Sequence, residues 1–240
     1  MTAVEVGVEV AADGEVAVVT LRRERKLNAL STGLEHELLA ALGSARVTTS
    51  RAVVVTGGGT VFSAGADVDE LRDMTPEAIA EYYRGSGRVY ERLAGLPQPT
   101  VAAITGYCLG GGLELALAAD LRVADPRAVF GLPEVGLGIL PSSGGIARLV
   151  RALGPARTRD LVLRARRFGP DQAERWGLLT EVTETGEHLA RALALAHELT
   201  ALPPPALAVT KQVIDAAAES SHHTALLLER LAYTALHRTT

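Results

Sequence analysis

The stretch ITGYCLGGGLELALAADLRVA, residues 104–124, contains the pattern from which the rest of the fold is predicted. The apolar residues 101–104 are typical of a buried strand, TGYCLGGG follows them, and a helical pattern runs from Gly111 to Ala118. A short strand, LRVA, ends the stretch. The same order occurs earlier, as AVVV (52–55), the glycine-rich TGGGTVFSAGAD (56–67) and a helical pattern at 68–72. Strand, loop and helix repeated in this way predict an α/β core.

The glycines Gly110 to Gly112 allow two interpretations. Glycine is the poorest helix former after proline, so a triplet at a helix start suggests that the backbone must stay accessible there. The alternative is an ordinary turn, with Glu114 in the first helical turn because the helix dipole favours an acid at that place. Both interpretations fit the local sequence.

Composition limits the class of protein. The 240 residues are 48% hydrophobic and 22% charged, which is enough to bury a sizeable core in one large domain. A net charge of −4 gives no basic footprint for nucleic acid. The single cysteine, Cys108, rules out an internal disulfide and a multi-cysteine metal site. No signal-peptide pattern opens the chain, and the uncharged stretch 93–113 is divided by proline and glycine. We therefore expect a cytoplasmic protein without a metal, and no nucleic-acid or membrane partner.

The remaining elements define two regions. Residues 4–10 and 16–21 predict a hairpin, residues 32–42 and 76–93 predict helices, and PEVGLGILPSSGG (133–145) predicts a loop. From Gly144 onward the pattern is nearly all helical, and from about residue 187 it is rich in Ala and Leu. These features predict an α/β core over 1–185 and a helical oligomerisation region over 186–240.

Common catalytic plans are missing from the sequence. It has no HExxH pair, no G-x-S-x-G elbow, no P-loop and no complete dinucleotide fingerprint. What remains is two carboxylates, Glu114 and Glu134, and two glycine-rich junctions. Ala66 and Gly111 occupy corresponding places at the helix starts of those junctions, where backbone N–H groups are unpaired. Two such N–H groups converging on one oxygen form an oxyanion hole. Glu134 follows a proline, so it also fits an ordinary helix start on the surface.

Five motifs, in this order and with this spacing, resemble those of the crotonase (enoyl-CoA hydratase/isomerase) superfamily over about residues 5–237. They are LRRERKLNAL (21–30), FSAGADVDEL (62–71), ITGYCLGGGLELALAADLRVA (104–124), FGLPEVGLGILPSSGG (130–145) and FGPDQAERWGLLTEV (168–182). The resemblance implies a spiral of repeated β-β-α units with a helical C-terminal part that forms trimers or hexamers. It also implies an acyl-CoA substrate, so that coenzyme A arrives with the substrate and no separate cofactor is expected.

The resemblance also assigns roles by position. Ala66 and Gly111 correspond to the oxyanion donors, and Glu114 and Glu134 to the two glutamates of hydratases. This implies hydration of a trans-2-enoyl-CoA to a 3-hydroxyacyl-CoA, with Glu114 as base on the water and Glu134 giving the proton to C2. The coenzyme A contacts implied are Lys26, Leu27, Ala29, Ala64, Asp67 and Val68. The water and acyl pocket implied is Leu71, Leu113, Pro141 and Ser142.

Some residues depart from the family pattern, and two other functions stay open. Glu24 stands where the family usually has proline, and Ser142 where it usually has glycine. The sequence ends at LHRTT, before the position of the family's usual last helix, which helps to cover coenzyme A. An isomerase or specialised lyase on the same scaffold is one alternative. A non-catalytic acyl-CoA-binding subunit is the other. Loss of absorbance of an enoyl thioester, which follows its hydration, would distinguish a hydratase from both alternatives.

Overall fold

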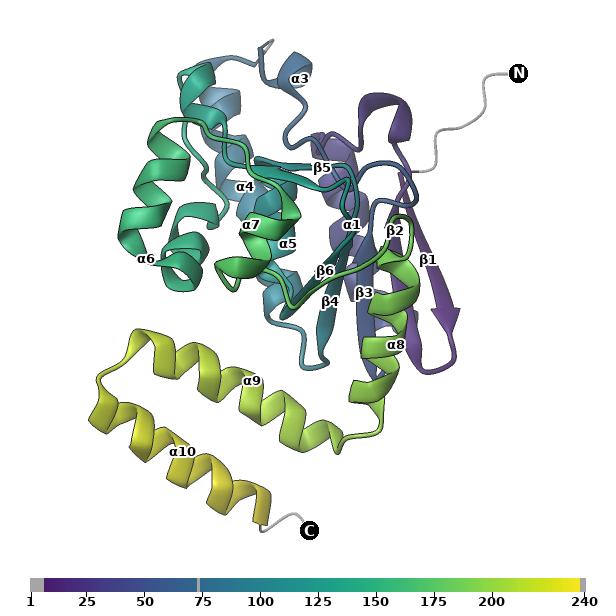
Figure 1. Cartoon of the computed structure of the whole chain (residues 1–240), viewed down its shortest axis with the longest axis vertical. Helices are drawn as coiled ribbons and strands as arrows, with labels where there is room; N and C mark the ends of the chain where they lie inside the picture. The colour runs from purple at the N-terminus through teal and green to yellow at the C-terminus, as the bar shows by residue number, and fades with distance from the viewer. Residues whose placement is uncertain (1–6, 73, 238–240) are drawn as a thin grey trace.

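A six-stranded sheet carries the core of the computed structural model, which describes residues 7–72 and 74–237 (Figure 1). Its strand order is β1-β2-β3-β4-β6-β8. Only the β1–β2 hairpin is antiparallel. The strands are β1 (Val8–Asp13), β2 (Val16–Leu21), β3 (Ala52–Thr56), β4 (Thr100–Ile104), β6 (Leu121–Ala124) and β8 (Glu181–Val182). The hairpin was expected from the sequence, with a first strand over 4–10, of which residues 4–6 lie outside the described residues.

A second, smaller layer of pairing lies beside this sheet. Strands β5 (Tyr107–Leu109) and β7 (Val129–Gly131) pair in parallel, and single bridges at Ser63↔Cys108 and Phe130↔Phe168 extend the layer on both sides. The chain therefore passes from β3, β4 and β6 into this layer each time before it enters a helix, which is the expected spiral. The sequence analysis assigned 107–109 to a connection, because a three-residue strand is too short to show alternation.

Helices α1 and α4 begin at residues whose side chains cap them. The Ser31 hydroxyl accepts from the N–H of Leu34 at the start of α1, and the Thr75 hydroxyl accepts from Ala78 at the start of α4. The helices are α1 (Thr32–Gly43), α2 (Ala45–Thr48), α3 (Val68–Arg72), α4 (Pro76–Ala94), α5 (Gly111–Ala118), α6 (Gly145–Leu163), α7 (Pro170–Arg175), α8 (His188–Thr200), α9 (Pro204–Glu219) and α10 (His222–His237), with short 3-10 turns at Glu24–Lys26 and Glu134–Leu137.

Helix α8 belongs to the layer that covers the sheet. Its Ala192 and Ala196 are fully buried in a cluster with Val54, Val101 and Val123 of the sheet. The boundary expected at residue 186 grouped this helix with the C-terminal region, because its Ala- and Leu-rich composition matches that of the helices after it. The packing instead separates α9 and α10 from the rest, as a helical pair that lies apart from the sheet (Figure 1).

Ion pairs tie α9 to the core, including Arg151 of α6 with Glu219 of α9, and the α9–α10 pair exposes an apolar surface. Lys211 of α9 pairs with Asp120 (2.7 Å) and donates to the carbonyls of Leu96 and Gln98. Large apolar side chains of the pair remain exposed, including Ile214, Leu227, Leu231 and Tyr233. Among the described residues, no single helix has the length and apolar character to cross a membrane. Helices α8 and α9 meet those criteria only together, and they are bent by 109° at their junction.

Candidate active site

The loop-to-helix junctions before α3 and α5 lie side by side because their backbones pair. The N–H of Ser63 donates to the carbonyl of Tyr107 (2.8 Å), and the N–H of Leu109 donates back to the carbonyl of Ser63 (3.0 Å). A Cβ placed on Gly111 would lie 3.7 Å from the backbone nitrogen of Ala66. The two positions that correspond in the sequence are therefore neighbours in space.

The N–H of Ala66 faces away from the pairing of its own segment. The N–H of Leu30 donates to the carbonyl of Gly65 (2.7 Å), and the carbonyl of Leu30 accepts from the N–H of Asp67 (3.1 Å). The parallel bridge between Leu30 and Ala66 is thus formed by the residues before and after Ala66, and it does not use the N–H of Ala66 itself. Gly111 is the first residue of α5, where an N–H has no acceptor within the helix. No backbone carbonyl of the described residues accepts from either N–H. Both amides are thus available to a ligand oxygen.

The three glycines at this junction have different structural reasons. Gly110 has a φ of 52°, a left-handed conformation that favours glycine. A Cβ on Gly112 would lie 2.5 Å from the backbone oxygen of Ser63, which blocks any side chain. A Cβ on Gly111 would meet only side-chain atoms at close range, the Tyr90 hydroxyl at 3.0 Å and Leu30 at 3.2 Å. Backbone conformation and packing account for Gly110 and Gly112, and the accessible amide of Gly111 lies between them.

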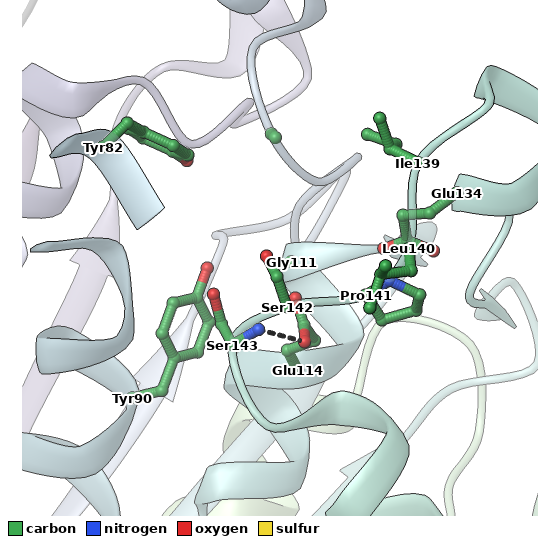
Figure 2. Close-up of a pocket in the computed structure, with 11 residues that line it drawn as sticks. Tyr82, Tyr90, Gly111, Glu114, Glu134, Ile139, Leu140, Pro141, Ser142 and Ser143 are labelled. Carbon is green, nitrogen blue, oxygen red and sulfur yellow. Dashed lines mark hydrogen bonds between the residues drawn. The ribbon is translucent and has the colours of Figure 1, made fainter. Parts of the chain in front are cut away.

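A cavity of about 30 Å³ lies beside these amides (Figure 2). This volume is room for about one water molecule. The structure brings six of the expected site residues to its walls: Ala66, Gly111, Glu114, Glu134, Pro141 and Ser142. Two carboxyl groups and two available amides therefore meet at one small space.

Glu114, on α5, is held in place by the loop before α6. Its side chain is 3% exposed, and Oε1 accepts from the N–H groups of Ser143 (2.8 Å) and Gly145 (2.8 Å). Burial raises the pKa of Glu114, while these two N–H groups and the Arg148 guanidinium oppose the rise. The two hydrogen bonds fix the orientation of the carboxyl and favour its ionised form.

Glu134 lies in a less polar setting. It is 9% exposed, and among the described residues its Oε2 is buried without a hydrogen-bond partner. Burial raises the pKa of Glu134 to about 7, and the nearby Glu114 carboxyl adds to the rise, opposed by the N–H of Glu134 itself. A large fraction of Glu134 is therefore protonated at neutral pH. An unpartnered buried oxygen also leaves a place for a water or a substrate atom.

The segments expected to contact coenzyme A lie against each other. The N–H of Ala64 donates to the carbonyl of Leu27 (2.9 Å), which places residues 26–29 beside 64–68. Leu27 and Val68, one from each segment, are exposed apolar side chains. Lys26 is exposed and pairs with Asp69 at 3.2 Å.

Asp67 is occupied by a partner that the sequence analysis missed. The Arg23 guanidinium pairs with Asp67 (2.7 Å) and also donates to the carbonyl of Ala29 (2.9 Å). Burial acts to raise the pKa of Asp67, but the hydrogen bonds from Arg23 and from the N–H of Glu70 hold it below its usual range. The Asp67 carboxylate thus joins the two segments to each other.

Two expected pocket residues lie elsewhere, and three lining residues were not expected. Leu113 is fully buried in the hydrophobic core, and neither it nor Leu71 lines the cavity in the described part of the chain. Tyr82 and Tyr90 of α4 and Ser143 do line it. The tyrosines are eight residues apart on one helix face, a spacing visible in the sequence, but the sequence does not show which face meets the cavity.

The described residues contain no group of three or more His, Cys, Asp or Glu side chains that could hold a metal ion. Cys108 is fully buried, and burial raises the pKa of its thiol well above the usual value. It packs in the core as a small apolar residue.

Comparison with known proteins gives one consistent family. Residues 11–239 match the sequence model of the enoyl-CoA hydratase/isomerase family. A probable enoyl-CoA hydratase of Mycobacterium tuberculosis is 37% identical over 91% of this chain and 84% of its own length. The short-chain-enoyl-CoA hydratase of Clostridium acetobutylicum is 36% identical over 92% of this chain and 85% of its own. The crystal structure of an enoyl-CoA hydratase from Bacillus anthracis superposes with a TM-score of 0.90 at 34% identity, covering 95% of this chain and 90% of that one.

The contacts of the triplet predict that its glycines differ in tolerance. Gly112→Ala places a Cβ 2.5 Å from a backbone oxygen, so we expect it to lower the free energy of unfolding by about 1–3 kcal/mol. Gly111→Ala meets only side-chain atoms closely and should cost less. Urea denaturation measures both, with Gly43→Ala as a control because nothing lies within 4 Å of that Cβ position. A Gly112→Ala protein as stable as the wild type would contradict the packing account.

Proposed function

The chain belongs to the enoyl-CoA hydratase/isomerase family, and from this premise we propose that it adds water to a trans-2-enoyl-CoA thioester to give a 3-hydroxyacyl-CoA. The observation that carries the proposal is the meeting of two buried carboxyl groups, Glu114 and Glu134, at a cavity bordered by two available amides. A hydration needs one group to activate water, one to supply a proton, and a site for the charge that develops on the thioester.

The amides of Ala66 and Gly111 supply the site for the developing charge. When water adds at C3, electrons move through C2 onto the thioester oxygen, which gains enolate character. Two preorganised N–H donors stabilise that oxygen in the transition state, an effect worth roughly 10²–10³-fold in kcat for each donor. Their positions follow from the backbone and need no side-chain ordering during the reaction.

The two glutamates have unequal surroundings, which supports different roles for them. Glu114 accepts two backbone N–H hydrogen bonds that favour its carboxylate, so it acts as the base that takes a proton from water. Glu134 has a pKa raised to about 7 and an unpartnered oxygen, so it carries the proton that is delivered to C2. The water oxygen bonds to C3, one water proton passes to Glu114, and the Glu134 proton passes to C2, so the atoms balance. The negative charge moves from Glu114 to Glu134 during the step.

We extend the proposal to the binding of coenzyme A, the need for a cofactor and the location of the protein. The surface made by Lys26, Leu27, Ala29, Ala64 and Val68 receives coenzyme A, with Asp67 holding its two segments together. No separate cofactor takes part, since coenzyme A is carried by the substrate. A cytoplasmic location stays a prediction from the sequence.

The paired helices α9 and α10 support a proposal of self-association. Ile214, Leu227, Leu231 and Tyr233 of this pair are large apolar side chains that stay exposed, and exposed apolar patches mark sites of protein contact. A homotrimer, or a hexamer built from trimers, is what the family resemblance implies. We expect light scattering to give a mass of at least three chains at micromolar concentration. A monomer under those conditions would contradict the proposal.

The two glutamates provide the direct test. Glu114→Gln and Glu134→Gln keep the side-chain shape but remove the base and the acid, so each should lower crotonyl-CoA hydration by roughly 10²–10⁴-fold. The double variant should lose less than the product of the two, because the pair acts as a unit. Loss of absorbance of the enoyl thioester measures the rate, and circular dichroism checks folding. Near-normal hydration in either single variant would argue against a two-glutamate hydratase and in favour of an isomerase or lyase.

The raised pKa of Glu134 predicts a pH dependence. The proton donor must be protonated, so kcat/KM for hydration should fall about tenfold for each pH unit above a value near 7. Because the carboxyl groups of Glu114 and Glu134 interact, the pKa observed in the rate profile belongs to the two groups together. Initial rates between pH 5.5 and 9 measure this limb, and the residual activity of Glu134→Gln should lack it. A wild-type profile that stays flat up to pH 9 would show that Glu134 does not deliver the proton.

A further inference from the structure

Glu35 is a buried carboxyl that the proposed hydration does not use. It lies on α1 among Leu34, Leu38 and Leu42, the other side chains that this helix buries, and it is 6% exposed. Burying a carboxyl at a position typical of an apolar residue is costly unless the carboxyl has partners. The partners of Glu35 therefore indicate what it does.

The described partners of Glu35 come from α4 and reach the catalytic cavity. The hydroxyls of Tyr82 (3.4 Å) and Tyr90 (3.3 Å) both contact Oε1 of Glu35. These distances are at the long end of hydrogen bonding. Both tyrosines also line the catalytic cavity (Figure 2). The Tyr90 hydroxyl would lie 3.0 Å from a Cβ on Gly111. A polar cluster thus leads from the side of the cavity at Gly111 to Glu35.

A second and larger cavity lies beside the cluster of Glu35, Tyr82 and Tyr90. It has a volume of about 430 Å³, is formed between α1 and α4, and shares Tyr82 with the catalytic cavity. Its lining is mixed. Glu35 lines it together with the polar side chains Thr32, His36, Glu81 and Arg88 and the apolar side chains Leu39, Met74, Ala78 and Val89. The catalytic cavity, at about 30 Å³, has no room for an acyl chain beyond the reacting carbons. The adjoining cavity has the volume that a chain of several carbons needs.

The wall at Glu35 does not suit a plain alkyl chain, although much of the remaining lining is apolar. An alkyl chain in contact with Glu35 would remove water from the carboxyl and offer no hydrogen bond in return. Burial already raises the pKa of Glu35 to about 7, against the two tyrosine hydrogen bonds, and the nearby carboxylates Glu114 and Glu70 raise it further. A hydroxyl on the chain would donate to the carboxyl in either protonation state.

Resting on the proposed hydratase function, we propose that the cluster of Glu35, Tyr82 and Tyr90 selects enoyl-CoA substrates whose acyl chain carries a hydroxyl or similar hydrogen-bond donor beyond the double bond. In this assignment Glu35 is a specificity-determining residue that contacts the distal part of the acyl group. Sites built to hydrogen-bond a substrate hydroxyl discriminate strongly against analogues that lack it, because their polar groups are left unpaired.

The test compares substrates of one chain length. The value of kcat/KM is measured for trans-2-hexenoyl-CoA and for its 4-hydroxy and 5-hydroxy derivatives, with crotonyl-CoA as the short reference. We expect at least one hydroxylated substrate to exceed hexenoyl-CoA by tenfold or more. If both derivatives are equal to or poorer than hexenoyl-CoA while crotonyl-CoA is hydrated, the selection proposal is overturned and the hydratase function stands. Absence of hydration of all four substrates overturns the function itself.

Variants assign the preference to Glu35. Glu35→Leu should reduce the ratio of hydroxylated to plain substrate by at least tenfold, and Glu35→Gln, which keeps an acceptor oxygen, should restore part of it. Because the readout is a ratio within each variant, a general change in turnover does not affect it. If Glu35→Leu fails to fold, Glu35→Gln and Tyr82→Phe give the same comparison. Glu37→Leu is the matched control, since it removes an exposed carboxylate from the same helix. An unchanged ratio in the folded Glu35 variants overturns the proposal.

Discussion

The pairing of two short backbone segments, Ser63 with residues 107–109, is the constraint on which the site depends. Its hydrogen bonds hold the junctions before α3 and α5 close together, although 45 residues separate Ser63 from Cys108. The six-stranded sheet places those segments, since β3 and β4 are parallel neighbours and deliver the chain to the second layer from the same end. The amide positions therefore follow from strand order and hydrogen-bond register. A side chain at Gly112 would meet the Ser63 backbone and force these segments apart.

The same framework sets the charge on the glutamates. Glu114 lies on the buried helix α5, and burial of its ionised carboxylate destabilises the folded protein. The loop before α6 offsets part of this cost, because two of its N–H groups donate to the carboxylate. Arg148 holds this loop, donating to the carbonyl of Ser143 (2.9 Å) and pairing with Glu91 of α4 (2.7 Å). Packing of α4, α5 and α6 is thereby coupled to the protonation of a group in the cavity.

The sequence predicted the features that repeat or carry strong local signals. The helix 111–118, the buried strands at 52–55 and 101–104, and the neighbouring glycine-rich junctions have clear periodicity or breakers, and the structure has these elements where they were expected. Tyr107–Leu109 was missed because three residues carry no usable period. Leu113 was expected in the pocket from the family resemblance, yet successive helix residues point about 100° apart, so Leu113 enters the core while Glu114 faces the cavity. Tyr82, Tyr90 and Glu35 meet only through the packing of α1 on α4, which a single helix pattern does not contain.

Three carboxyl groups in one poorly solvated region must share their protons. The Glu114 charge raises the pKa of both Glu134 and Glu35, and only Glu114 of the three accepts two backbone N–H hydrogen bonds. Coulomb repulsion is reciprocal, so a charge on Glu35 raises the pKa of Glu114 in turn. A donor that hydrogen-bonds to Glu35 favours that charge, and therefore strengthens Glu114 as a base. Occupancy of the cavity between α1 and α4 is in this way coupled electrostatically to Glu114, the group proposed to activate water. The distal end of the acyl chain can then influence catalysis without contacting the reacting atoms.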